Sequence, residues 1–258
     1  MVLQTLLDNA ATLALVATRI AGFVVASPFP GERVHPSARV AVVVVLGFLV
    51  AHSLPMPAHL PELGVGMVIP ASIEFACGAL IGACFRFLLA AAEVLGGAAA
   101  QSTGLGAAAL YDPGLGTHDT AIGQVISLFA MMIAVAAGTH RVAIAYLVES
   151  FRVLPIGGPA NVALGAPVLV DLAGQCLVIG VRLALPAIAI SLAAQAALAM
   201  IARAAPSLQI FNVGFSVLIA SGLVAIAASL PAIATGLAEH LSQLGPAIDR
   251  LLGAVGGG

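Results

Sequence analysis

The sequence predicts an all-α integral membrane protein with about six long apolar helices, and three observations support this prediction. Apolar residues make up 61% of the 258-residue chain and charged residues only 8%, whereas soluble domains are roughly half apolar and about a quarter charged. The mean hydropathy is +1.15. The apolar residues gather in long runs, without the alternation of polar and apolar positions that barrel strands require.

The same composition excludes several classes of protein. An ordinary soluble enzyme carries more charge than this, and a disordered chain needs low hydrophobicity and high charge. The chain has 9 basic residues, all arginine, against 11 acidic ones, with no basic run. Nucleic-acid binders carry basic patches, so we expect no nucleic-acid partner.

Six apolar runs define the expected helices, and each is long enough, or nearly so, to cross a hydrocarbon core of about 30 Å. In chain order they are residues 10–28, 39–54, 65–100, 121–148, 172–201 and 213–237. The breaks contain turn-forming residues. They read SPFPG from residue 27, PMP from residue 55, YDPG from residue 111, PIGGP from residue 155 and RAAP from residue 203.

The runs show no fixed-period repeat and no long linker, so a single domain over residues 1–258 is expected. The N-terminus, MVLQTLLDNA, has no basic region and is not expected to be a cleaved signal peptide. Residues 65–100 would form a helix about 54 Å long, which must tilt, break or extend beyond lipid. The loop arginines divide almost evenly between the two sides, so membrane orientation stays open.

Six charged residues lie inside the apolar runs, where a charge is costly unless it faces protein or water. They are Arg19, Glu74, Arg86, Glu93, Arg141 and Arg182. One hypothesis is a proton or ion relay, to which His140 could add a titrating group. The other is buried pairing or contact with partner subunits, with His140 making a structural hydrogen bond at a helix end.

Spacing gives one of these runs a packing face. Glu74, Gly78 and Gly82 recur every four residues, which predicts a small-residue stripe where another helix packs closely. No HExxH, GxSxG or Walker A motif occurs, and Cys77, Cys84 and Cys176 form no CxxC pair. We therefore expect no catalytic residues, no metal and no cofactor.

The break after the third run is rich in glycine and uncharged until Asp112, reading GGAAAQSTGLGAAALYDPGLGT over residues 96–117. Such a loop at membrane depth must be buried in protein or line a cavity. We interpret it as a plug or constriction element, the alternative being a loop packed inside the subunit. The plug hypothesis rests on Gly104, Leu105, Gly106, Leu110, Tyr111, Asp112, Pro113 and Gly114.

The order and spacing of several short motifs resemble the FliR/SctT family of type III secretion export-apparatus proteins, from about residue 19 to residue 215. The matching positions are Arg19, Gly22, Pro28, Pro36 and Arg39; Glu74, Gly78, Gly82 and Arg86; Gly96, Gly104, Asp112 and Pro113; Gly138, His140, Ser150, Phe151 and Leu154 to Gly157; and Leu183 to Pro186, Arg203, Pro206, Leu208, Phe211, Gly214 and Phe215.

The resemblance implies a non-enzymatic subunit of an export gate in the bacterial inner membrane, at the flagellar basal body. It implies assembly with FliP-like and FliQ-like subunits beside FlhB-like and FlhA-like proteins, in contact with membrane lipid. Unfolded flagellar subunits would pass through the channel, with residues 104–117 as the plug. An injectisome subunit of the same family and a stand-alone secondary transporter remain the alternatives.

The resemblance and the apolar context together nominate two further sets of residues. Buried-charge or assembly positions are Arg19, Glu74, Arg86, Glu93, His140, Arg182 and Arg203. Helix-packing or turn positions are Gly78, Gly82, Pro155, Gly157, Pro186 and Pro206.

Overall fold

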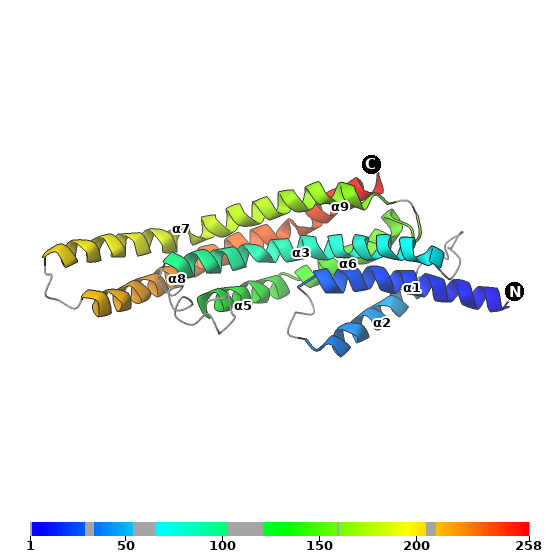
Figure 1. Cartoon of the computed structure of the whole chain (residues 1–258), viewed down its shortest axis with the longest axis horizontal. Coiled ribbons are helices and arrows are strands. Elements are labelled where there is room, and N and C mark those ends of the chain that lie inside the picture. The colour runs from blue at the N-terminus through cyan, green and yellow to red at the C-terminus, as the bar shows by residue number, and fades with distance from the viewer. Residues whose placement is uncertain are drawn as a thin grey trace. The chain divides into compact units, whose positions relative to one another are not determined.

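The computed structural model describes residues 2–28, 34–53, 65–102, 121–158, 160–204 and 210–257, and these residues contain helices and no strand. The all-α prediction is therefore confirmed. In chain order the elements are α1 (Val2–Ala26), α2 (Pro36–Ser53), the 3-10 helix η1 (Val65–Met67), α3 (Val68–Ser102), α5 (Ala121–Ala136), α6 (Thr139–Val153), the 3-10 helix η4 (Val162–Gly165), α7 (Ala166–Ala204), α8 (Ile210–Ser242) and α9 (Leu244–Gly256) (Figure 1).

The expected number of six spanning helices is not confirmed. Within the described ranges, four helices are long and apolar enough to cross a membrane, or five if α5 and α6 together form one span. The first predicted run supplies only a shorter apolar stretch, Ala10–Ala26. The long third helix is present as α3, with 35 residues.

The fourth predicted run, residues 121–148, is two helices rather than one. Gly138 adopts the left-handed backbone conformation, with φ at 73°, between α5 and α6. A right-handed helix cannot continue through that conformation, and glycine adopts it without steric cost. The apolar composition on both sides of Gly138 hid this break from the sequence analysis.

The chain packs as two compact units. The first comprises Met1–Leu88, Gly138–Ala173 and Ser242–Gly258, and the second comprises Leu89–Ala137 and Gly174–Leu241. The first unit contains α1, α2, the N-terminal part of α3, α6, η4 and α9. Within it α1 lies beside α2 and beside the N-terminal part of α3 (Figure 1).

Glycines bring the backbones of α1 and α3 into close contact. A Cβ atom added to Gly78 would collide with the carbonyl oxygen of Arg19, and one added to Gly22 would collide with that of Phe75. A Cβ on Gly82 would lie 2.6 Å from the carbonyl oxygen of Phe23. The helix that packs against the predicted glycine stripe of α3 is therefore α1, and its approach is closest where neither helix carries a side chain.

A C-terminal helix that the sequence analysis did not predict completes the first unit. One face of α9 is buried, formed by Leu244, Ala247, Ile248, Leu251, Leu252 and Val255. The backbone N–H of Asn161 donates a hydrogen bond to the carbonyl of Val255, at 3.0 Å. The hydroxyl of Tyr146 donates to Asp249, also at 3.0 Å. Helix α9 therefore packs against α6 and the segment around η4.

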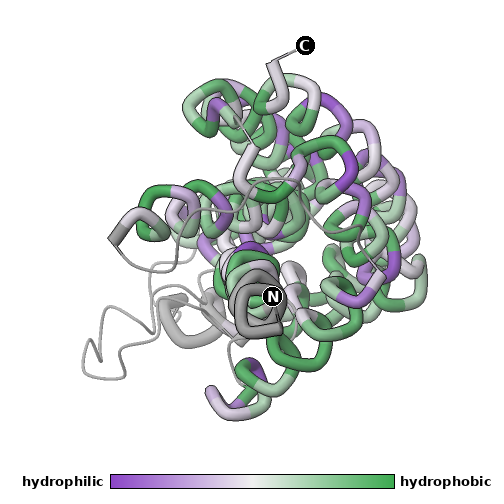
Figure 2. Tube along the Cα trace, turned by 90° about the vertical axis from the view of Figure 1, so that its right-hand side faces the viewer, coloured by the Kyte–Doolittle hydropathy of each residue, from purple (hydrophilic) through white to green (hydrophobic). Residues whose placement is uncertain are grey.

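The second unit contains the C-terminal part of α3 together with α5, the larger part of α7, and α8 up to Leu241. Its closest packing again involves small residues: Ala99, Ala187 and Ala225 form one buried cluster. A Cβ on Gly180 would lie 2.7 Å from the carbonyl of Ala91. Hydrophobic residues, drawn in green, are prominent in the described helices, which are seen end-on in Figure 2. Small residues therefore set the helix spacing in this unit, as in other membrane bundles.

Candidate functional site

A buried ion pair joins α1 to α3 in the first unit. The guanidinium of Arg19, on α1, donates through Nε to Oε2 of Glu74, on α3, at 2.5 Å. The side chains of Arg19 and Glu74 are only 1% and 3% exposed. The glycine contact between the two helices lies one turn away at Gly78, so the pair sits where the backbones already meet.

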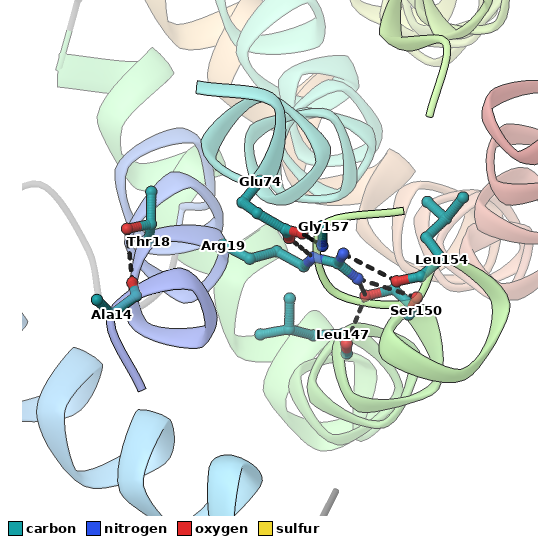
Figure 3. A network of polar contacts seen from close by, with 8 residues as sticks. All are labelled: Ala14, Thr18, Arg19, Glu74, Leu147, Ser150, Leu154 and Gly157. Atoms are coloured by element: carbon teal, nitrogen blue, oxygen red, sulfur yellow. Dashed lines mark hydrogen bonds and ion pairs between the residues drawn. The ribbon is translucent and has the colours of Figure 1, made fainter. Parts of the chain in front are cut away.

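The remaining donors of Arg19 bind the C-terminal end of α6 (Figure 3). Nη1 donates to the carbonyl oxygen of Ser150 at 3.0 Å and to its hydroxyl at 3.3 Å. Nη2 donates to the carbonyl oxygen of Leu154 at 2.9 Å. The guanidinium carbon also lies 4.2 Å from the centre of the Phe151 ring, a cation–π contact. Arg19 therefore binds the end of α6 at two carbonyls: that of Ser150, which also accepts a hydrogen bond from the N–H of Leu154 at 2.8 Å, and that of Leu154, just after the helix.

The second carboxylate oxygen of Glu74 holds the turn that follows α6. The backbone N–H of Gly157 donates to Oε1 at 3.1 Å. Gly157 has a φ of 69°, and Gly158 closes the turn by donating to the carbonyl of Pro155 at 3.0 Å. The predicted turn residues Pro155 and Gly157 therefore lie in a turn, and the carboxylate of Glu74 fixes its position.

The chemistry of this cluster is that of a structural clamp. Both oxygens of Glu74 accept hydrogen bonds, and the guanidinium of Arg19 binds one carboxylate, one hydroxyl and two carbonyls. These hydrogen bonds and the ion pair compensate for the burial of two charged side chains. The geometry is the one that the pairing hypothesis describes, because Arg19 and Glu74 bind each other and the end of α6 inside the subunit.

The other nominated charges lie elsewhere. Arg86 and Glu93 on α3 and Arg182 and Arg203 on α7 are exposed, and His140 on α6 is half-buried. Pro186 lies exposed inside α7. The whole set of predicted plug residues, together with Pro206, lies outside the described residues. The structure thus brings together Arg19, Glu74, Gly78, Pro155 and Gly157, and no group of three or more potential metal-binding side chains occurs in the described ranges.

Two features escaped the sequence analysis, one in the site and one in the fold around it. Arg19 binds the backbone carbonyls of Ser150 and Leu154. Every residue type has such a carbonyl, so the sequence does not mark these two positions. The docking of α9 did leave a signal, because Leu244, Ile248, Leu251 and Val255 repeat at helical spacing. That spacing predicts one buried helical face.

Four or five candidate spans among the described residues define a multi-pass α-helical membrane protein. Residues 10–244 match the model of the bacterial export proteins, family 1, so the chain belongs to that family. It is 29% identical to the flagellar biosynthetic protein FliR of Caulobacter vibrioides over 90% of this chain and 93% of that protein. It is 29% identical to FliR of Escherichia coli over 86% and 85%, and 28% identical to FliR of Aquifex aeolicus over 90% of each.

Proposed function

We propose that this protein is a non-enzymatic subunit of the flagellar type III export gate. The observation that carries the proposal is the family match over residues 10–244, joined to flagellar relatives that align with nearly the whole chain. The composition supports it too, since a chain that is 8% charged offers few groups for catalysis. We place the protein in the bacterial inner membrane, at the flagellar basal body.

The proposed partners are FliP-like and FliQ-like subunits, which would form the channel with this chain, and FlhB-like and FlhA-like proteins beside it. Unfolded flagellar subunits would be the cargo. Exposed apolar side chains support an assembled state, because Phe48 on α2, Met132 on α5 and Val224 on α8 are each at least 64% exposed in the single chain. Lipid or neighbouring subunits must cover such side chains.

We further propose that the segment over residues 104–117 plugs the idle channel. Its support is the sequence: small apolar residues and glycines, with no charge before Asp112. A plug of this composition blocks ions, because a dry apolar constriction offers nothing to replace their hydration shells. Its glycines allow the segment to be displaced when cargo enters.

Deletion of the gene tests the export function directly. The deletion strain is expected to release no hook or filament subunits into the medium, and the wild-type gene supplied in trans is expected to restore them. Normal export of flagellar subunits by the deletion strain would contradict the proposal. If the deletion strain instead stops secreting injectisome substrates, the chain belongs to the injectisome branch of type III secretion.

A further inference from the structure

An arginine stands on the outer, apolar face of α7. Arg182 is exposed, and the residues around it on the same face are Val178, Val181 and Leu185, which are 67%, 45% and 53% exposed. Gly174, two turns before Arg182, has open space where a Cβ would stand. These five residues are called the Arg182 face below. It combines a single positive charge with an otherwise apolar surface.

No described residue binds the Arg182 side chain. Two other exposed arginines have partners: Arg152 donates to Glu149 at 3.0 Å and Arg250 to Asp171 at 3.4 Å. Among the described residues, Arg182 makes no such hydrogen bond or ion pair. The positive charge of Arg182 is therefore not paired with an anionic side chain in the described part of the chain.

The backbone adds a second polar group at the same level. Pro186 lies one turn after Arg182 inside α7. A proline has no N–H, so the carbonyl oxygen of the residue four places earlier loses its helical donor. That residue is Arg182. A guanidinium and a main-chain carbonyl thus both need partners at one point on an apolar face.

Lipid chains satisfy neither group. A guanidinium in hydrocarbon costs several kcal/mol or more, and an unpaired carbonyl adds to that cost. Arg182 lies roughly 24 Å along the helix from Ala166 and roughly 33 Å from Ala204, at 1.5 Å per residue. The nearest exposed side chains on the turns before and after it are apolar. The charge therefore calls for a protein partner with a complementary anion.

We propose that the Arg182 face binds an apolar helix of another subunit, which presents an aspartate or glutamate to the guanidinium of Arg182. A side-chain N–H or O–H on the same helix would donate to the carbonyl freed by Pro186. Gly174 leaves room for the backbone of that helix to approach closely. The inference rests on the proposed function only for which assembly supplies the subunit.

Photo-crosslinking in cells tests this interface. A photoreactive amino acid replaces Val178, in the wild-type background and in Arg182→Glu and Arg182→Met. We expect an adduct to a second polypeptide whose crosslinked peptide lies in an apolar segment carrying Asp or Glu. Its yield is expected to fall at least fivefold in both variants. Arg152→Glu, which reverses an exposed charge on α6, is the matched control and is expected to leave the yield unchanged.

A charge swap completes the test. Replacing the mapped acidic residue of the partner with arginine is expected to restore the adduct in Arg182→Glu. Crosslinks to lipid alone would overturn the interface. So would an adduct yield that is unchanged in both variants while the protein keeps its wild-type thermal stability. If gate subunits still co-purify in that case, the proposed function stands. An Arg182-dependent adduct to a membrane protein unrelated to export would keep the interface and overturn the function.

Discussion

Arg19 donates to Glu74 at 2.5 Å across the contact between α1 and α3, and the two residues are 55 positions apart in the sequence. The pair also binds the end of α6 and the turn at Gly157. One ionic contact therefore fixes four chain segments of the first unit.

Removing one member of the pair is expected to destabilise the protein strongly. Arg19→Met leaves the Glu74 carboxylate buried without its cation, a change that costs about 3–5 kcal/mol. In the double variant Arg19→Met/Glu74→Leu no charge remains buried, so its loss is expected to be smaller than the sum of the two single losses. Cys77, Cys84 and Cys176 are buried free thiols. A fluorogenic thiol dye therefore reports unfolding in mild detergent, and strictly additive losses would contradict the clamp.

Glycine substitutions separate helix contact from helix propensity. Gly78→Ala places a methyl group against the Arg19 carbonyl and is expected to lower the unfolding temperature by several degrees or to prevent folding. Gly97→Ala is the matched control, because Gly97 lies in the same helix with nothing within 4 Å of its added Cβ. It is expected to be neutral or stabilising by up to about 1 kcal/mol. Equal effects of the two changes would argue against the close α1–α3 contact.

The C-terminal helix is expected to be part of the folded core. Leu251 is 1% exposed on the buried face of α9, so Leu251→Ala is expected to cost roughly 2–5 kcal/mol. Gly253→Ala, two residues along the same helix and facing open space, serves as the control. The thiol-dye assay measures both variants. A Leu251→Ala protein as stable as the control would show that α9 does not pack as described.

Deleting residues 106–114 tests the plug. The deletion is expected to leave assembly intact but to make the inner membrane leaky to small ions, because the apolar constriction is lost. Membrane potential and potassium efflux, measured in cells that express the assembled complex, give the readout. A deletion variant that assembles normally and adds no leak is incompatible with the plug.

Arg86 and Arg203 are expected to act in assembly rather than in proton transfer. Arg86→Met and Arg203→Met should reduce the amount of assembled complex, and the complexes that do form should export normally. Arg86→Lys keeps the charge but loses the planar fork of the guanidinium. The amount of complex in native gels and the export rate per complex separate the two roles. An Arg86→Lys complex that assembles fully yet exports nothing would argue for a role in the transport step.

Several helix positions were predictable from the apolar runs, but the run over residues 121–148 forms two helices. The long α3 follows from such a run, and the spacing of Glu74, Gly78 and Gly82 predicted its packing face. The spacing did not reveal that α1 covers this face, because nothing local in the sequence records which distant helix contributes the opposing glycine. The contacts of Gly22 and Arg19 with α3 are visible only in the folded structure.

Local backbone geometry accounts for the features that the sequence analysis missed. Gly138 breaks a run whose composition is apolar on both sides, and its positive φ cannot be read from that composition. The carbonyls of Ser150 and Leu154 are common to every residue type, so no motif marks them as ligands of Arg19. Helix α9 was predictable from the spacing of Leu244, Ile248, Leu251 and Val255. The sequence analysis did not place a helix there, because the segment ends in three glycines.

Affinity purification of the tagged protein from bacterial membranes in mild detergent, with mass spectrometry of the co-purifying chains, tests whether the protein is an export-gate subunit. We expect FliP-like and FliQ-like subunits to be recovered with it in a single complex. A matched sample carrying Arg19→Met should yield less of that complex, since the subunit itself is destabilised. A protein that purifies as a stable monomer or homodimer, and transports a small solute in reconstituted vesicles, would contradict the export-gate account and favour a stand-alone transporter.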